Sequence, residues 1–442
     1  MSFLDLTATI LNLLKKQSFQ KERGNNHVHI WEHELENVLD LKNLTLHTQA
    51  LPQCFLASKN AKREDLALGA TKTFRRLDET ETLDKYLEQE NVQLFGGRRF
   101  DPMKNIGNEW RTLGDIYLFL PRIHFITSGN KTRIRINFIE NDLLDNGELK
   151  PEVLFEIHDT ISFTEQSQLN PYFSFDHQLP GESEWGRKIN GCLNIFSNGK
   201  IGKIVLSRKQ IFTAKSNTDL KIQLEKTKVE GNYIFYFKYS EEDAFLSVSP
   251  EKLFSIRNGR IEVDALAGSS PRGKSKSDDD RLGDDLLKNQ KELNEHRFVT
   301  DSIMDSLTEL GLKPEFIVAE TLLKLPYIQH IHSLISCPLG RHTKILDLME
   351  KLHPTPAVGG SPRELAMENI RAFEPFDRGL YAAPMGIIGK NYSEIIVGIR
   401  SALINGKNLH IYGGAGIVPG STAEREWNET QNKMKAIAGL FS

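Results

Sequence analysis

The stretch that decides the fold is SEIIVGIRSALINGKNLHIYGGAGIV, residues 393–418. Its apolar runs are separated by turn residues, which is the pattern of adjacent antiparallel strands. The run just upstream, YAAPMGIIG at residues 381–389, has the same character. The pattern of these runs predicts that the last hundred residues form antiparallel strands mixed with helices.

Similar strand-like runs continue towards the N-terminus, among them DIYLFLPRIHFITSG, NYIFYFKYS and RIEVDALAGSS. A charged helical stretch is expected from about residue 276 to 310, and no internal repeat or low-complexity linker interrupts the chain. This order of elements predicts an α+β fold, with large antiparallel β-sheets and helices packed outside them. We expect residues 1–180 to contribute to the same body as a catalytic region at 181–442.

Composition excludes several classes of protein. The 442 residues are 39% hydrophobic, which is enough for a sizeable core, and the net charge of −3 argues against a nucleic-acid partner. No apolar run reaches the roughly 18 residues of a membrane span. The N-terminal residues 1–21 predict an amphipathic surface helix, not a signal peptide. The widely separated Cys54, Cys192 and Cys337 favour a reducing, cytoplasmic location.

The segment GSSPRGKS, residues 268–275, matches the pattern of a phosphate-binding loop, G-x-x-x-x-G-K-[ST]. Such a loop should open directly into a helix, whereas the aspartate-rich KSDDDRLGDD follows here. Pro271 would also remove one N–H group from the cradle. We interpret the match as a polar turn, and a nucleotide-binding protein is kept as the alternative from another class.

Two segments carry glutamates three residues apart, Glu292 with Glu295 and Glu426 with Glu429. On a helix, each pair shares one face. One interpretation is a solvated face in which Glu429 pairs with Lys433, worth a few tenths of a kcal/mol. The other is that the two helices bring four carboxylates together, a donor set that favours Mg²⁺.

Three further charged residues lie in apolar sequence. Lys203 is expected on a strand, either as an edge-strand gatekeeper or as a desolvated amine that serves as a general base. Glu251 follows Pro250, either as an exposed turn residue or as a buried general acid. Arg400 is expected alone in an apolar strand, where a buried arginine would need an anion.

Taken together, these stretches resemble the chorismate-utilising enzymes, which include anthranilate, aminodeoxychorismate, salicylate and isochorismate synthases. The resemblance covers roughly residue 182 to the C-terminus, and more loosely the region from FGGRRFDP onward. Its motifs occur in order: GKIVLSR, SPEKLF, ALAGSSPRG, KELNEH, HPTPAVGG, EPFDRGLYAAPMG, IVGIRSA, and YGGAGIV followed by EREWNETQNK.

Single positions indicate the branch of the family. Ammonia-using anthranilate synthases typically carry glutamine where this chain has Lys203, and aminodeoxychorismate synthases commonly carry lysine where it has Ala267. The segment Leu266–Ser269 resembles that of isochorismate synthases, whereas salicylate synthases share the lysine and the glutamates and stay an alternative. The chain contains no glutamine amidotransferase domain, and no such subunit is expected. One departure is Gly413, where relatives often have alanine.

The resemblance implies a role for each matched residue. Lys203 would activate the water that attacks C2 of chorismate, and Glu251 would protonate the departing C4 hydroxyl. Glu295 and Glu429 would bind Mg²⁺ directly, with Glu292 and Glu426 acting through water or steadying these ligands. The remaining matched positions would hold the substrate: Arg400, Gly268, Ser269, Tyr381, Gly414, Gly416, His353 and Lys433. Menaquinone synthesis is the pathway that the motifs favour over a siderophore pathway.

Overall fold

The structure is a computed structural model that describes residues 3–20, 26–163, 172–324 and 328–441. The chain forms two compact units. Unit 1 comprises residues 1–251, 354–386 and 397–442, and unit 2 comprises residues 252–353 and 387–396. The functional boundary predicted at residue 181 falls inside unit 1 and stays a prediction.

Unit 1 contains a long series of antiparallel strand pairs. In ladder order these are β7 (Phe173–Leu179), β8 (Lys203–Ala214), β19 (Asn408–Ile417), β18 (Ser401–Asn405), β10 (Asp243–Ser249), β9 (Tyr233–Lys238), β2 (Gln53–Ala57), β3 (Arg63–Phe74), β5 (Ile116–Ser128), β6 (Lys131–Ile139) and β1 (Val28–Leu35). The short strands β4 (Leu94–Arg98) and β15 (Gly360–Ser361) pair with β5 and β8. The antiparallel sheet expected from the sequence is confirmed, and the N-terminal region contributes β1, β2 and β3 to it.

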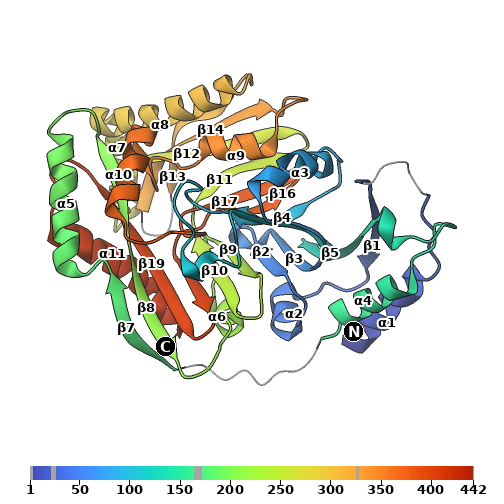
Figure 1. The fold of residues 1–442 in the computed structure, drawn as a ribbon. Helices are drawn as coiled ribbons and strands as arrows, with labels where there is room; N and C mark the ends of the chain where they lie inside the picture. Colours follow the sequence, from blue (N-terminus) through green and yellow to red (C-terminus); the bar gives the residue numbers. More distant parts are fainter. Residues whose placement is uncertain (1–2, 21–25, 164–171, 325–327, 442) are drawn as a thin grey trace. The chain divides into compact units, whose positions relative to one another are not determined.

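The helices of unit 1 are α1 (Phe3–Leu14), α2 (Leu41–His47), α3 (Thr80–Leu87), α4 (Pro151–Thr160), α5 (Glu182–Phe196), α6 (Lys221–Lys226), α10 (Arg363–Phe373) and α11 (Ala423–Ala438). Single 3₁₀ turns lie at Lys59–Ala61, Leu77–Glu79, Asn108–Trp110, Glu140–Asp142 and Gly439–Phe441. Helix α11 packs on β19, and Figure 1 shows β8 and β19 side by side with this helix next to them.

Unit 2 is a smaller sheet with helices. Its ladder order is β13 (Glu315–Lys324), β14 (Ile328–Pro338), β12 (Arg260–Pro271), β11 (Lys252–Arg257) and β17 (Tyr392–Val397). Helices α7 (Lys276–Lys288) and α8 (Gln290–Glu309) pack on β12 and β14, and α9 (Ile345–Leu352) contacts α8. The helical stretch predicted from about residue 276 to 310 is therefore present as two helices. Strand β16 (Pro384–Ile388) spans the boundary between the segments of the two units.

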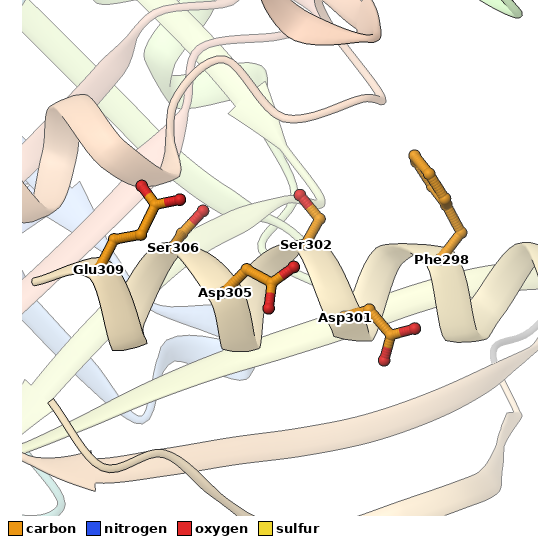
Figure 2. A pocket seen from close by; sticks show the side chains of 6 residues that line it. All are labelled: Phe298, Asp301, Ser302, Asp305, Ser306 and Glu309. Carbon is orange, nitrogen blue, oxygen red and sulfur yellow. The ribbon is translucent and has the colours of Figure 1, made fainter.

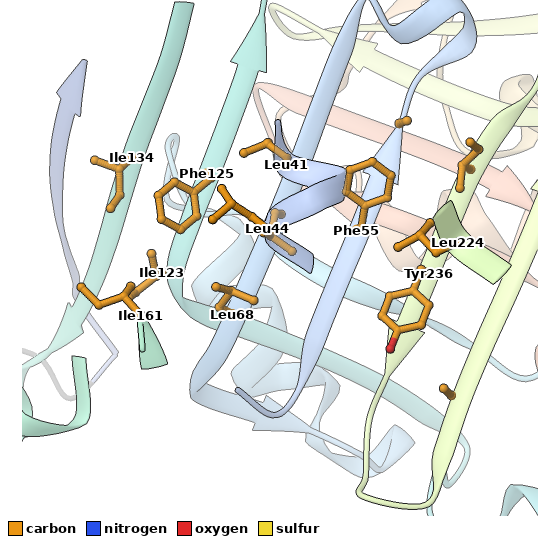
Figure 3. Close-up of a cluster of buried hydrophobic side chains, with 14 of the residues drawn as sticks. Leu41, Leu44, Phe55, Leu68, Ile123, Phe125, Ile134, Ile161, Leu224 and Tyr236 are labelled. Atoms are coloured by element: carbon orange, nitrogen blue, oxygen red, sulfur yellow. The ribbon is translucent and has the colours of Figure 1, made fainter. Parts of the chain in front are cut away.

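The core of unit 1 explains why its first helix forms. Leu6, Ile10 and Leu14 recur every four residues on α1 and are buried in a cluster with residues such as Phe55 and Phe125. Figure 3 shows part of this cluster, in which side chains of α2, β2, β3, β5 and β6 lie in the same cluster as Leu224 of α6 and Tyr236 of β9. Each such side chain contributes about 1.5–3 kcal/mol on burial. The N-terminal segment is thus amphipathic, as predicted, and its apolar stripe belongs to the core.

Two further findings concern the surface and the cysteines. Among the described residues, no helix has the length and apolar content needed to cross a membrane. All three cysteines are free and buried. Burial raises the pKa of the Cys192 thiol to about 12 and that of Cys337 to about 11.

Candidate active site

Lys203 at the start of β8 and Tyr381 in the turn before β16 each lie beside a glycine of β19. A Cβ atom at Gly416 would lie 2.9 Å from Cε of Lys203, and one at Gly414 would lie 2.7 Å from the hydroxyl oxygen of Tyr381. A larger residue at Gly414 would require the Tyr381 ring to shift, whereas one at Gly416 would displace only the flexible end of Lys203. The structure therefore brings together four of the residues that the sequence assigned to the site.

Lys203 lies at the start of β8, where Ser361 of β15 pairs with it, and the residue is half-buried. Strand β8 has partners on both sides, because β19 pairs along one edge and β7 and β15 pair along the other. The gatekeeper interpretation required an exposed edge strand, and the structure gives Lys203 no such position.

Glu251 follows β10 and is half-buried in unit 1. Its Oε1 atom accepts a hydrogen bond from the Thr355 hydroxyl at 3.2 Å. Burial raises the pKa of the Glu251 carboxyl, and this effect outweighs the hydrogen bond from Thr355 and the positive charges of Lys203, Lys59 and Lys433, which lower it. The direction of the pKa shift is the one that a general acid requires.

Helix α11 carries Glu426 and Glu429 and begins at a Thr422 cap. The ammonium group of Lys433 donates to Glu429 at 2.8 Å and to the carbonyl oxygen of Gly414 at 3.0 Å. The solvated Glu429–Lys433 pair of the sequence interpretation is therefore present, and the same lysine ties the helix to β19 beside Gly414. Because both side chains are about half exposed, the pair itself contributes well under about 1 kcal/mol.

Glu426 is in a different position from Glu429. The residue is only 5% exposed, but its carboxylate oxygens are not among the buried polar atoms that lack a partner in the described part of the chain, so solvent can reach them. The position of Glu426 suits a carboxylate that coordinates a cation directly or through a bound water.

In unit 2, the other glutamate pair lies on α8 beside a bulge of β12. Gly268 has a left-handed φ of +71° at this bulge, and a Cβ atom there would lie 3.2 Å from the carbonyl oxygen of Glu292. The backbone N–H of Ser269 donates to Glu292 Oε2 at 3.2 Å, and the Ser269 hydroxyl contacts Nδ1 of His330 at 2.8 Å. The structure thus brings Gly268, Ser269 and Glu292 together, while Glu295 is exposed.

The donor set fits a hard cation, because both pairs offer only carboxylate oxygens. In neither unit do three or more described His, Cys, Asp or Glu side chains gather as a metal site. His296, next to Glu295, is buried and contacts the Ser333 hydroxyl at 2.8 Å. The chain therefore offers two carboxylate pairs, one in each unit, and the gathering of all four stays a prediction.

The prediction for Arg400 is wrong in its structural part. The residue is exposed and lies in a bend between β17 and β18, with a left-handed φ of +51°. The strand breaks because Ile399 N–H turns back to the Val397 carbonyl at 2.8 Å. Arg400 Nη1 contacts the side-chain oxygen of Asn232 at 3.4 Å, and no carboxylate pairs with it among the described residues.

His353, buried at the end of α9, lies in unit 2, and its role stays a prediction.

The phosphate-loop match is a strand followed by a capped helix. Contrary to the sequence interpretation, a helix does begin directly after the motif, since Ser275 caps α7. However, Gly268–Pro271 belong to β12, and the N–H groups of Gly273 and Lys274 donate to Asp279 at 2.9 Å and Asp278 at 3.3 Å. The protein's own carboxylates occupy the donors that a phosphate would need.

A buried ion pair that the sequence analysis did not assign supports the site. Glu374 Oε1 accepts from both the N–H and the hydroxyl of Ser207, at 2.8 and 2.7 Å, and Arg378 Nε donates to Glu374 Oε2 at 2.9 Å. Arg378 also donates to the Val205 carbonyl at 2.7 Å. The pair ties β8 to the segment that carries Tyr381. Opposite charges four residues apart in EPFDRGLYAAPMG were the available signal.

Two surface hollows lie away from these residues. One is a groove of about 320 Å³ along a single face of α8, lined by Phe298 and acidic and serine side chains, as Figure 2 shows. The other, of about 650 Å³, lies in unit 1 beside the buried Lys209–Glu109 ion pair. Neither contains a predicted site residue.

Comparison with known proteins identifies the family of the chain. Residues 18–441 match the family described as chorismate binding enzyme. The chain is 30% identical to the chloroplastic isochorismate synthase 2 of Arabidopsis thaliana, over 83% of this chain and 68% of that protein. It is 32% identical to isochorismate synthase MenF of Bacillus subtilis, over 78% and 73%. The solved structure of MenF, the menaquinone-specific isochorismate synthase from Escherichia coli, has a TM-score of 0.84 at 25% identity and covers both chains fully.

Proposed function

This chain belongs to the family of chorismate-binding enzymes, and on that premise we propose that it converts chorismate to isochorismate. One observation carries the proposal beyond the family. Lys203 and Glu251, an amine and a carboxyl that interact electrostatically, lie in one unit, and burial raises the pKa of the carboxyl. Such a pair suits a reaction that takes a proton from one group and gives one to another.

The reaction follows from the charges of these two groups. Lys203, in its neutral form, takes a proton from water as the water oxygen bonds to C2 of the ring. The ring double bonds shift, and the C4–O bond breaks. Glu251, in its protonated form, gives its proton to the departing hydroxyl, so that water enters and water leaves. The atoms of substrate and product are the same, and no electrons are transferred to another molecule.

The surrounding residues position the two groups and the substrate. Thr355 orients the Glu251 carboxyl through its hydrogen bond. Tyr381 and the backbone of Gly414 and Gly416 bind the pyruvyl side chain, with Arg400 as the cation for its carboxylate. Gly268 and Ser269 contribute the substrate-binding loop of unit 2.

The metal in this proposal is Mg²⁺, which when bound neutralises the ring carboxylate and orients the substrate. Glu295 and Glu429 would hold it directly, and Glu292 and Glu426 would act through water. The largely buried position of Glu426 on α11 supports this assignment. Glu292 already accepts the Ser269 N–H and so links a metal-holding helix to the substrate loop.

We further propose that the product enters menaquinone synthesis in the cytoplasm and that no amidotransferase subunit is required. The pathway rests on the likeness to the menaquinone-specific enzyme, and the location agrees with three free cysteines. The motifs that resemble isochorismate synthases point the same way.

The test is incubation of the purified chain with chorismate and Mg²⁺, with the products identified by chromatography and mass spectrometry. We expect isochorismate to form, and chorismate to form again when isochorismate is supplied. Salicylate and pyruvate at neutral pH would instead indicate a salicylate synthase. ATP binding that Lys274→Ala abolishes, with chorismate left unchanged, would favour the nucleotide-binding alternative.

A further inference from the structure

Arg208 is a fully buried arginine that forms no ion pair with a carboxylate among the described residues, and only the more distant charge of Glu182 acts on it. It lies on β8 in unit 1, and its side chain points to the opposite face of the strand from Lys203. Burial lowers the pKa of its guanidinium to about 10, so it stays charged at neutral pH. Burying a charge costs free energy unless hydrogen bonds of good geometry compensate for the lost solvation.

The contacts of Arg208 are concentrated on helix α11. Nη1 donates to the Thr430 hydroxyl at 2.9 Å and to the Trp427 carbonyl at 3.3 Å, and Nη2 lies 3.4 Å from the Gln431 side-chain oxygen. The guanidinium carbon lies 3.0 Å from the centre of the Trp427 ring. Arg208 also contacts Gln178 of β7, at 3.1 Å from Nη2, and Trp185 of α5, whose ring centre lies 5.9 Å from the guanidinium carbon.

Two of the residues that Arg208 contacts are the immediate neighbours of the predicted metal ligands on this helix. Trp427 follows Glu426, and Thr430 follows Glu429. Because consecutive residues on a helix are about 100° apart, a fixed position of the first set fixes the direction of the second. A guanidinium fork can hold this rotation, whereas a point charge cannot.

Directly across the strand pair from Arg208 lies Gly413. A Cβ atom there would lie 2.8 Å from Cγ of Met434 and 2.9 Å from the Thr430 carbonyl oxygen. The absence of a side chain at Gly413 therefore lets α11 approach β19 closely. Arg208 and Gly413 together hold the same turn of the helix.

We propose that Arg208 is a positioning residue that fixes the rotation of α11, so that Glu426 and Glu429 face the metal. The proposal rests on the proposed function, since it takes these glutamates as ligands. Arg208 itself touches neither metal nor substrate in this role. It acts only through the helix.

The experiment compares Arg208→Lys and Arg208→Gln with Arg122→Lys. Arg122 is a matched control, because it is also buried in unit 1, but its partners are Asp142, Glu156 and the Asn137 carbonyl. All three variants should lower the melting temperature. Only the Arg208 variants should raise the Mg²⁺ concentration for half-maximal turnover, by about tenfold, as loss of an outer support of metal ligands does. Their KM for chorismate should change far less, and high Mg²⁺ should restore most of the turnover.

Two readouts do not depend on turnover. Hydrogen exchange should become faster in residues 423–438 of Arg208→Lys, and the rise in melting temperature on adding Mg²⁺ should need more metal. Wild-type exchange and metal response in both Arg208 variants would overturn the proposal, as would an equal shift in Arg122→Lys. If the wild-type chain does not convert chorismate, the proposed function fails, and these two readouts still decide the role of Arg208.

Discussion

Helices α8 and α11 carry the same glutamate spacing in different surroundings. On α8, in unit 2, Glu295 is exposed, and Glu292 accepts a backbone N–H from a neighbouring strand. On α11, in unit 1, Glu426 is largely buried, and Lys433 and Arg208 join the helix to two strands. Each unit thus contributes one pair of carboxylates, held in its own way.

The difference between the two helices shows which properties of a glutamate pair its sequence spacing can predict. A spacing of three residues places both carboxylates on one face of a helix. Whether that face is buried depends on the partner strand, and here Gly413 on β19 allows a close approach that α11 needs. Unit 1 also contains Lys203 and Glu251, so the comparison predicts that proton transfer belongs to unit 1 and metal binding to both.

The largest effect should come from Lys203→Ala, which tests whether proton transfer belongs to unit 1. We expect kcat to fall by about 10³-fold or more, because the substitution removes the proposed base, while chorismate binding changes little. Steady-state kinetics and a direct binding titration measure the two quantities. Lys200→Ala, at an exposed lysine just upstream, is the control and should behave as wild type. Normal turnover in Lys203→Ala would remove this residue as the base.

An intermediate effect should come from replacing one main ligand on each helix, Glu429→Gln on α11 and Glu295→Gln on α8. Each should raise the Mg²⁺ requirement by about 10–100-fold, because each removes one negative ligand. A magnesium titration of turnover measures this change. Asp305→Asn, on the acidic face of α8 that lines the groove in Figure 2, controls for general loss of negative charge. A normal titration in either glutamine variant would assign the metal to the other helix alone.

The smallest effect concerns the pH dependence of stability at Glu251. Burial raises the folded-state pKa of this carboxyl, so its stabilising contribution is present below about pH 4.5 and is lost as pH rises through the folded pKa. Glu251→Gln mimics the neutral form at every pH. The melting temperature of Glu251→Gln minus that of the wild type should therefore increase by about 1–3 °C as the pH rises from 4 to 8.

Thermal melts at several pH values measure this gain. Glu241→Gln, at an exposed glutamate of the same unit, should keep a constant difference from the wild type. A gain that shrinks as pH rises would contradict the raised pKa.

Local patterns predicted the strands, the helices and both glutamate pairs, because periodicity depends on near neighbours. Arg400 was misplaced because IIVGIRSALI is apolar throughout, and the left-handed turn that breaks it has no local marker beyond Gly398. Arg208 and the Glu374–Arg378 pair were missed for another reason. The partners of Arg208 lie far away in the chain, and so does Ser207, which joins the Glu374–Arg378 pair to β8, so these links follow from packing and not from spacing.

The burial of all three cysteines has a practical consequence for studying this enzyme. Thiol reagents attack the thiolate, and Cys192 and Cys337 are kept both protonated and out of reach. The native cysteines of the folded chain should therefore not react with maleimides, so none of them has to be replaced before labelling. One cysteine added at an exposed position of α8 or α11 would take a fluorophore selectively, and dye uptake elsewhere would report unfolding.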